Sequence, residues 1–283
     1  MNLKDLKQQF ISIINEEYEG QECIALFELA ASHILKLSKS QLLIKHDLEV
    51  NDSDLKALFQ IAREIHSGRP IQYILGEAEF YGLKFYVNPD VLIPRPETEE
   101  LVYIIIETIK SSSSRYKTLL DIGTGSGCIP VAIKKNLPNV NVSALDVSVP
   151  ALEVAKGNAK LNSVAVNFIP ANILTYATEQ VYDIIVSNPP YIKEDEKASM
   201  HLNVLNHEPH LALFVTNEDP LVFYKAIADF SQKQLSKDGF LFFEINEFLG
   251  NEMVEMLSSK GFRDVKIIKD MQGKDRMISC QYL

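Results

Sequence analysis

The segment SNPPYI at residues 187–192 places an amide, two prolines and a phenol directly after the apolar run YDIIV. Proline has no backbone N–H to donate, but its carbonyl still accepts a hydrogen bond. The side-chain carbonyl of Asn188 and the backbone carbonyl of Pro189 can therefore hold the two hydrogens of a planar NH2 group. Tyr191, which follows Pro190, offers an aromatic face for a flat group. The segment predicts a site for a planar amine or amide nitrogen, and its structural alternative is a rigid turn.

A glycine-rich loop, DIGTGSG at residues 121–127, lies at the junction of a predicted strand and helix. Glycines allow the backbone to turn tightly and to approach a ligand closely. Asp146 ends the next predicted strand about 20 residues later, where a carboxylate can accept both hydroxyls of a ribose. The predicted cofactor-binding residues of the loop are Gly123, Thr124, Gly125, Ser126 and Gly127.

The spacing of these glycines distinguishes between two kinds of cofactor. Dinucleotide-binding loops usually read GxGxxG, with a pyrophosphate at the helix N-terminus. Here the spacing is GxGxG, and the loop has no basic residue to meet a phosphate. The loop therefore favours S-adenosylmethionine, with S-adenosylhomocysteine as product and no metal. Asn172 and Ile173, after the third predicted strand, either flank the adenine or form an ordinary loop.

Methyl transfer to a planar nitrogen needs no nucleophilic side chain from the protein. The lone pair of such a nitrogen is delocalised, so the site must orient it and draw charge from its N–H bonds. Proximity and electrostatics would be the main catalytic terms for attack on a sulfonium methyl. Asn188, Pro189 and Tyr191 are the predicted catalytic residues, and with Pro190 they form the predicted substrate site.

Strands and helices alternate after residue 97, which predicts an α/β fold with a mostly parallel sheet. The expected strands are 118–122, 142–147, 166–169, 182–187 and 239–245, with helices at 97–110, from 128, at 150–162, 220–235 and 247–259. Two last strands, in 265–269 and 276–281, have only a short connection and should pair antiparallel at one edge. SSSS at 111–114 predicts a polar loop.

The region before this domain divides into two parts. Residues 1–70 have apolar residues at spacings of three and four, which predict a small N-terminal helical domain. Residues 71–96 are rich in aromatic and β-branched residues and are interrupted by glycines, which predicts a β-hairpin linker. The domain with the chemistry is expected to span 97–283.

Composition limits the environment and the partners. The net charge of −10 disfavours direct binding to nucleic acid. Three widely spaced cysteines without a CxxC pair indicate neither a disulfide framework nor a zinc site, and fit a reducing compartment. The N-terminus lacks an apolar signal core, and no later run reaches about 18 apolar residues. We expect a cytoplasmic protein with no membrane anchor, and a monomer.

DIGTGSG, Asp146 and NPPY in this order resemble the class I, Rossmann-like S-adenosylmethionine-dependent methyltransferases that modify planar nitrogens. The tetrapeptide alone leaves open adenine, cytosine and glutamine nitrogens. The segment GRPIQYILGEAEFYGLKFYVNPDVLIPRPETEELV at 68–102 is very similar to the linker of the HemK/PrmC family of protein-(glutamine-N5) methyltransferases, and EPHLAL, LFFEI and GKDRM are similar to its later motifs. A related ribosomal-protein enzyme tends to show serine in an IPRSP stretch, where this chain has IPRPET.

The resemblance implies methylation of the glutamine of the GGQ motif in peptide chain release factors. By position, Gly123 to Gly127 would hold the methionine end of the cofactor, Asp146 the ribose, and Asn188 to Tyr191 the substrate glutamine. Asn188 would also contact the cofactor, and the N-terminal domain would recognise the release factor. Two departures are Asn172, where the family commonly has an acidic residue, and Asn246, where it commonly has glycine.

Several residues allow more than one interpretation. Arg95, Glu97 and Thr98 either line the site or cap the helix that begins there. Cys128 is better explained as a small packed residue than as a nucleophile. His207 and His210 are spaced like a metal pair, but Pro209 breaks the helix that would align them, and the sequence shows no third ligand.

Two rival functions follow from the same motifs. A nucleic-acid amino-methyltransferase must flip a base and contact phosphates, which the acidic composition disfavours. A cofactor-binding module without catalysis is disfavoured by the intact NPPY.

Overall fold

The computed structural model describes residues 1–112 and 115–282, which form two compact units. One unit comprises residues 1–76 and 201–207, and the other comprises 77–200 and 208–283. Of the expected serine loop at 111–114, the last two residues lie outside the described residues.

The first unit is helical, and polar side chains mark where its helices begin. The described helices are α1 Leu3–Ile14, α2 Gly20–Leu35, α3 Lys39–Ile44, α4 Asp52–His66, α5 Ile71–Leu75 and α9 Leu202–His207. Asn2, Ser38 and Asn51 accept hydrogen bonds from backbone N–H groups in the first turns of α1, α3 and α4. The amphipathic faces pack into one core, in which the rings of Phe10 and Phe27 lie 5.4 Å apart.

The short helix α9 reaches this unit from the other end of the sequence. The side-chain amide of Asn203 donates to the hydroxyl of Tyr18 at 2.8 Å. Nothing in the local pattern around residue 203 indicated this contact, because α9 is only six residues long.

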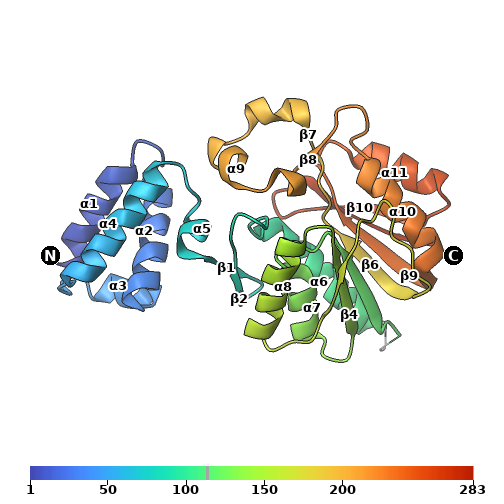
Figure 1. Ribbon diagram of the computed structural model, residues 1–283, viewed down its shortest axis with the longest axis horizontal. Coiled ribbons are helices and arrows are strands. Elements are labelled where there is room, and N and C mark those ends of the chain that lie inside the picture. The colour runs from blue at the N-terminus through green and yellow to red at the C-terminus, as the bar shows by residue number, and fades with distance from the viewer. Residues whose placement is uncertain (113–114, 283) are drawn as a thin grey trace. The chain divides into compact units, whose positions relative to one another are not determined.

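The second unit contains a seven-stranded sheet in the described residues, with strand order β10-β11-β9-β6-β3-β4-β5 (Figure 1). The strands are β3 Thr118–Ile122, β4 Asn141–Asp146, β5 Asn167–Pro170, β6 Tyr182–Ser187, β9 Leu235–Glu244, β10 Arg263–Lys269 and β11 Asp275–Gln281. The central strands β9, β6, β3, β4 and β5 are parallel, whereas β11 is antiparallel to β9 and β10 is antiparallel to β11. The predicted mostly parallel sheet with an antiparallel edge is confirmed.

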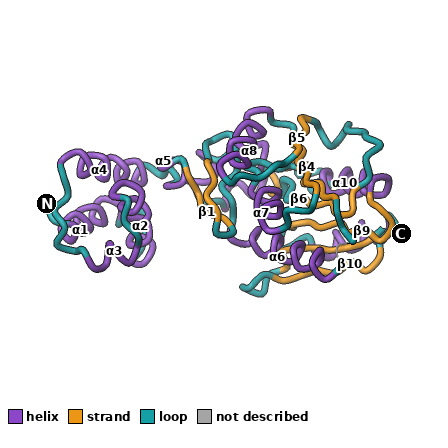
Figure 2. Tube along the Cα trace, turned by 90° about the horizontal axis from the view of Figure 1, so that it is seen from below, coloured by secondary structure: helices purple, strands orange, loops and turns teal. Residues whose placement is uncertain are grey.

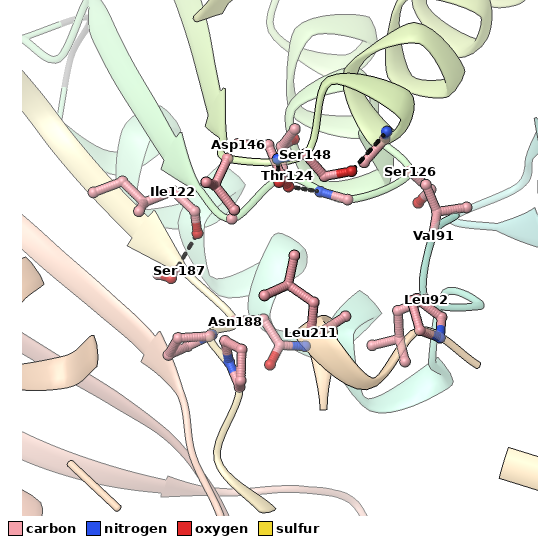
Figure 3. A pocket seen from close by; sticks show the side chains of 18 of the residues that line it. Val91, Leu92, Ile122, Thr124, Ser126, Asp146, Ser148, Ser187, Asn188 and Leu211 are labelled. Carbon is pink, nitrogen blue, oxygen red and sulfur yellow. Dashed lines mark hydrogen bonds between the residues drawn. The ribbon is translucent and has the colours of Figure 1, made fainter. Parts of the chain in front are cut away.

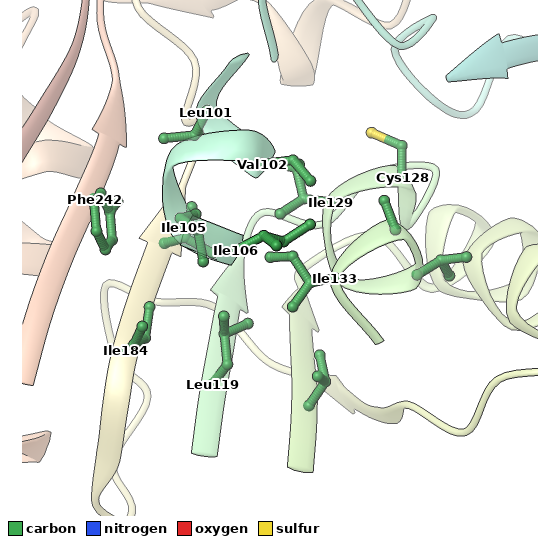
Figure 4. Packing of buried hydrophobic residues seen from close by; sticks show 14 of the residues in the cluster. Leu101, Val102, Ile105, Ile106, Leu119, Cys128, Ile129, Ile133, Ile184 and Phe242 are labelled. Atoms are coloured by element: carbon green, nitrogen blue, oxygen red, sulfur yellow. The ribbon is translucent and has the colours of Figure 1, made fainter. Parts of the chain in front are cut away.

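Helices cover both faces of this sheet (Figures 1 and 2). They are α6 Pro96–Ser111, α7 Cys128–Asn136, α8 Val149–Leu161, α10 Val222–Gln234 and α11 Gly250–Ser259. One core cluster joins α6 and α7 to the sheet, with Val102, Ile106 and Ile133 among its side chains (Figure 4). A second cluster joins α10 and α11 to the opposite face through residues such as Tyr224, Met253 and Leu257.

Short elements connect the larger ones. They are the hairpin β1 Glu77–Phe80 and β2 Leu83–Tyr86, the parallel pair β7 Ile192–Lys193 and β8 Phe214–Val215, and the 3-10 helices η1 Glu194–Ser199 and η2 His210–Ala212. The expected linker at 71–96 thus contains a helix, α5, before its hairpin. Gly76, at φ 70°, ends that helix, and Gly82, also at φ 70°, turns the hairpin.

Two element boundaries differ from the sequence prediction by more than two residues. The strand β9 begins at Leu235 rather than 239, with Asp238 at φ 63° and a register irregularity against β6. The helix α11 begins at Gly250 rather than 247, because the side chain of Asn246 accepts the N–H of Phe248 and forms a turn first.

Candidate active site

The carboxyl ends of three neighbouring strands bring the predicted motifs to one edge of the sheet. In the parallel register, Ile122 of β3 lies opposite Leu145 of β4 and opposite Ser187 of β6. The hydroxyl of Ser187 donates to the carbonyl of Ile122 at 2.6 Å, which ties the strand before NPPY to the strand before the glycine loop. Open α/β sheets bind ligands at this edge.

A cavity of about 280 Å³ opens at this edge of the sheet. Asp146, Thr124 and Ser126 lie along one side of it, Asn188 and Leu211 along another, and Val91 and Leu92 of the linker region contribute a further wall (Figure 3). The predicted residues that line it are Gly123, Thr124, Gly125, Ser126, Asp146, Asn172, Ile173, Asn188, Pro189 and Pro190. Gly127 and Tyr191 are not among its lining residues.

The glycine loop has a conformation that side chains other than glycine would strain. Gly123, Gly125 and Gly127 have φ values of 76°, 52° and 78°. The N–H groups of Gly123 and Thr124 both donate to the carbonyl of Leu145, at 2.8 and 3.0 Å. Gly127 serves packing instead, because a Cβ there would lie 2.9 Å from the Cβ of Ala155 on α8. The loop thus has two parts, one facing the cavity and one facing a helix.

Asp146 fixes the loop while it faces the cavity. Its Oδ2 accepts the N–H of Gly125 at 2.8 Å, and its Oδ1 accepts the N–H of Ser148 at 2.9 Å. Burial raises the pKa of this carboxyl, and the hydrogen bonds from Ser148 and Gly125 act in the opposite direction. Each carboxylate oxygen can accept more than one hydrogen bond, so Asp146 can still bind hydroxyl groups.

Two buried polar groups at the loop lack ordinary partners. The hydroxyl of Thr124, which lines the cavity, and both carboxyl oxygens of Asp121 make no well-formed hydrogen bond with the residues described. The pKa of Asp121 is raised to about 7, mainly by burial; the nearby hydroxyl of Thr124 acts to lower it and the charge of Asp146 to raise it. Buried polar groups are normally satisfied, so these groups fit a ligand that carries both kinds of group, such as the methionine end of S-adenosylmethionine, whose ammonium donates and whose carboxylate accepts. The sequence prediction did not include Asp121, although it opens the DIGTGSG loop.

NPPY divides between the cavity and the interior. Asn188, Pro189 and Pro190 line the cavity, whereas Tyr191 packs against the core cluster under α10 and α11. Burial raises the pKa of the Tyr191 hydroxyl, and so does the charge of Glu244. The phenol is therefore protonated at neutral pH.

The linker and the EPHLAL segment meet through an ion pair whose carboxylate is buried. Arg95 donates to Oε1 of Glu208 at 2.6 Å, and the N–H of Ile93 donates to Oε2 of the same carboxylate at 3.3 Å. The side chain of Glu208 is 1% exposed. Arg95 and Thr98 line the cavity, and Glu97 is not among the lining residues.

These contacts decide whether Arg95 and Thr98 line the site or cap the helix α6. Arg95 occupies the N-cap position of α6, but its side chain makes no capping hydrogen bond within the described residues. Thr98 donates to Oε2 of Glu244 at 2.6 Å. Both side chains therefore bond across the fold at the cavity instead of capping the helix. The sequence prediction did not include Glu244 among the site residues. A charged residue at the end of the buried strand LFFEI would have indicated it.

Three further predictions concern single residues. Asn172 is exposed at the cavity, and its side-chain oxygen accepts the N–H of Leu174 at 3.0 Å. Cys128 is buried, and burial raises the pKa of its thiol to about 12, which is consistent with a packed residue and not a nucleophile. Within residues 1–112 and 115–282, no group of three or more His, Cys, Asp or Glu is placed to hold a metal ion.

This sheet order with a glycine loop, an acidic strand end and a shared cavity defines a class I methyltransferase. Residues 102–211 match the family described as methyltransferase small domain, and residues 5–76 match the one described as PrmC N-terminal domain. The release factor glutamine methyltransferase of Flavobacterium psychrophilum is 45% identical over 284 residues, covering 100% of both chains, and that of Bacteroides thetaiotaomicron is 42% identical, covering 94% of this chain and 95% of its own. The chain belongs to the family of release factor glutamine methyltransferases.

Solved structures agree on the fold. A methyltransferase from Pyrococcus furiosus aligns with a TM-score of 0.52 at 20% identity, covering 71% of this chain and 90% of its own. The T. thermophilus 16S rRNA N2 G1207 methyltransferase aligns with a TM-score of 0.53 at 17% identity, covering 73% of this chain and 50% of its own. At these identities the likeness concerns the fold alone.

Proposed function

We propose that this enzyme transfers a methyl group from S-adenosylmethionine to the side-chain amide nitrogen, N5, of the glutamine in the GGQ motif of peptide chain release factors. The observation that carries the proposal is the single cavity lined by the glycine loop, Asp146 and the Asn188–Pro189 acceptors. The names of the relatives supply the substrate, because they are release factor glutamine methyltransferases at up to 45% identity.

The cofactor would lie along the glycine loop. Gly123 and Gly125 have no atoms within 4 Å of the position where a Cβ would be, so a ligand can approach their backbone closely. The hydroxyl of Thr124, which lines the cavity, offers an unsatisfied polar group for the methionine end, whereas the buried carboxyl of Asp121 opens the loop without lining the cavity. Asp146 would accept the ribose hydroxyls. Asn172 and Ile173 would flank the adenine, and the side-chain NH2 of Asn172 would donate to it while its oxygen accepts the N–H of Leu174.

The substrate amide would lie beside Asn188 and Pro189. The side-chain carbonyl of Asn188 and the backbone carbonyl of Pro189 would each accept one N–H of the glutamine side chain. Two such bonds fix the plane of the amide and draw positive charge onto its hydrogens, which increases electron density on nitrogen. S-adenosylmethionine, when bound, supplies an electrophilic methyl group on a sulfonium. Tyr191 follows Pro190 and packs in the interior outside the cavity lining, so we propose that its ring supports the NPPY segment from behind and does not stack on the amide.

The N-terminal helical domain would recognise the release factor. It has its own hydrophobic core and matches the PrmC N-terminal domain over residues 5–76. We also propose that the protein acts as a monomer in the cytoplasm. Cys23, Cys128 and Cys280 are buried free thiols, as suits a reducing compartment.

Transfer of labelled methyl from S-adenosylmethionine to purified release factor tests the proposal. A release factor whose GGQ glutamine is replaced should receive no label. Asn188→Ala should lower the transfer rate about 100-fold, because it removes one of the two acceptors, while cofactor binding measured by calorimetry is retained. Asn251→Ala, at an exposed position on α11, is the matched control and should leave both unchanged.

Two outcomes would contradict the proposal. Label that arrives in DNA or RNA, or that survives loss of the GGQ glutamine, would favour the nucleic-acid alternative. An unchanged rate in Asn188→Ala would exclude the amide clamp.

A further inference from the structure

The carboxyl of Glu244 lies behind the proposed amide clamp, outside the cavity but next to two of the side chains that line it, Thr98 and Asn188. Glu244 ends β9, and its residue is only 2% exposed. The hydroxyl of Thr98 donates to its Oε2 at 2.6 Å. The side-chain amide of Asn188 lies near the same carboxyl and lowers its pKa, as a hydrogen-bond donor does. The sheet register explains this contact, because Ser187 pairs with Phe243 and the next residues along the two parallel strands are Asn188 and Glu244.

The direction of the bond to Asn188 decides which end of its amide faces the cavity. An asparagine side chain has a carbonyl at one end and an NH2 group at the other, and the two ends have nearly the same shape. An ionised carboxylate only accepts, so it can bond only to the NH2 end. The carbonyl of Asn188 is then the end that remains for a ligand in the cavity.

We propose that Glu244 is a positioning residue, which holds the side chain of Asn188 with its carbonyl directed at the glutamine amide. This inference rests on the proposed function, because it assigns the carbonyl of Asn188 to that substrate. Thr98 holds the carboxyl in place from α6, and the hydroxyl of Tyr224 donates to the backbone carbonyl of Glu244 at 3.0 Å, so the group is fixed from two helices.

Protonation of Glu244 changes which end of the Asn188 side chain it can bind. A carboxylic acid has one O–H donor as well as a carbonyl acceptor, so it no longer binds only the NH2 end of Asn188. Where it donates to the carbonyl end, the NH2 end turns toward the cavity, two NH2 groups face each other, and neither can accept. We therefore expect the ionised form of Glu244 to be the active one.

The surroundings of Glu244 bring its titration into the neutral range. Its pKa is raised to about 7, mainly by burial and also by the charge of Glu97 on α6. The hydroxyl of Thr98, the positive charge of Arg276 on β11 and the amide of Asn188 lower it. The phenols of Tyr191 and Tyr224 also lie in this cluster, and both have pKa values raised by burial, so they stay neutral there.

Single-turnover methyl transfer to release factor, measured from about pH 5.5 to 9, tests the inference. The wild-type rate should fall about tenfold per pH unit below about pH 7, because only the ionised form is active. The Glu244→Gln variant should be about 10- to 100-fold slower, since its amide does not impose one orientation on Asn188. It should also lose the fall in rate below about pH 7, the acidic limb of the pH profile, because its amide does not titrate. Binding of S-adenosylmethionine should be unchanged. Glu153→Gln, an exposed position on α8, is the control and should behave as wild type.

Thr98→Val provides a second test that keeps the buried carboxyl. It removes a hydrogen bond to the ionised form, so the pH limb should move to higher pH. A merely structural role of Glu244 would change stability without moving the limb. The inference is wrong if Glu244→Gln keeps the wild-type rate or the wild-type pH limb, or if Thr98→Val leaves the limb in place. Wild-type protein that methylates no release factor would instead contradict the proposed function itself.

Discussion

Three glycines of the methyltransferase domain should respond very differently to replacement by alanine, for reasons that can be worked out from their surroundings. Gly127 has φ 78°, and an added Cβ would lie 2.9 Å from the Cβ and 3.2 Å from the Cα of Ala155. Gly123 has φ 76°, but its added Cβ would meet nothing within 4 Å. Gly157 lies inside α8 without a positive φ, and its added Cβ would also meet nothing.

The expected changes in the free energy of unfolding follow from these environments. Gly123→Ala should cost about 1–2 kcal/mol, the strain of a left-handed conformation. Gly127→Ala should cost about 2–5 kcal/mol, because overpacking adds about 1–3 kcal/mol to the same strain. Gly157→Ala should stabilise the protein by about 0.5–1 kcal/mol, since alanine is the better residue in a helix interior.

Urea denaturation and calorimetry measure this series. For a domain of this size, 1 kcal/mol corresponds to about 2–4 °C in Tm. The variant Ala155→Gly tests the contact itself: it should cost about 1 kcal/mol alone, but less than that in the Gly127→Ala background, where it removes the clash. Equal losses for Gly123→Ala and Gly127→Ala, or additive effects in this double-mutant cycle, would refute the reasoning.

Two more predictions concern charged groups at the cavity. Asp146→Asn should weaken S-adenosylmethionine binding by about 10- to 100-fold, because it replaces a charged acceptor of the ribose hydroxyls. Calorimetry measures the Kd, and an unchanged Kd would contradict this prediction. Arg95→Met should cost about 2–3 kcal/mol of unfolding free energy and Glu208→Gln only about 1 kcal/mol, because the buried carboxylate is the partner that cannot be solvated when left alone. If urea denaturation gave equal losses of unfolding free energy for the two variants, burial of Glu208 would not be what determines the cost of breaking the ion pair.

Much of the fold could be predicted because its signals are local. The alternation of apolar strands and amphipathic helices predicted the sheet and its helices, and the short connection DMQGKD predicted the antiparallel pairing of β10 and β11. The shortest elements could not be predicted, since β7 and β8 have two residues each and no period can be read from two residues. The start of β9 was misplaced because Asp238 and Gly239 look like a turn, whereas the strand continues through them.

The sequence by itself determined which chemical groups stand at the strand ends: the GxGxG loop after β3, Asp146 at the end of β4 and NPPY after β6. Parallel strands end at the same edge of a sheet, so local order was enough to bring these groups together. Only the tertiary structure decided which side chains lie behind these groups and bond to one another. Thr98 and Glu244 are 146 residues apart, and Arg95 and Glu208 are 113 residues apart. Their pairing depends on which strands are neighbours and in what register, and the periodicity within one segment carries no information about strand order or register.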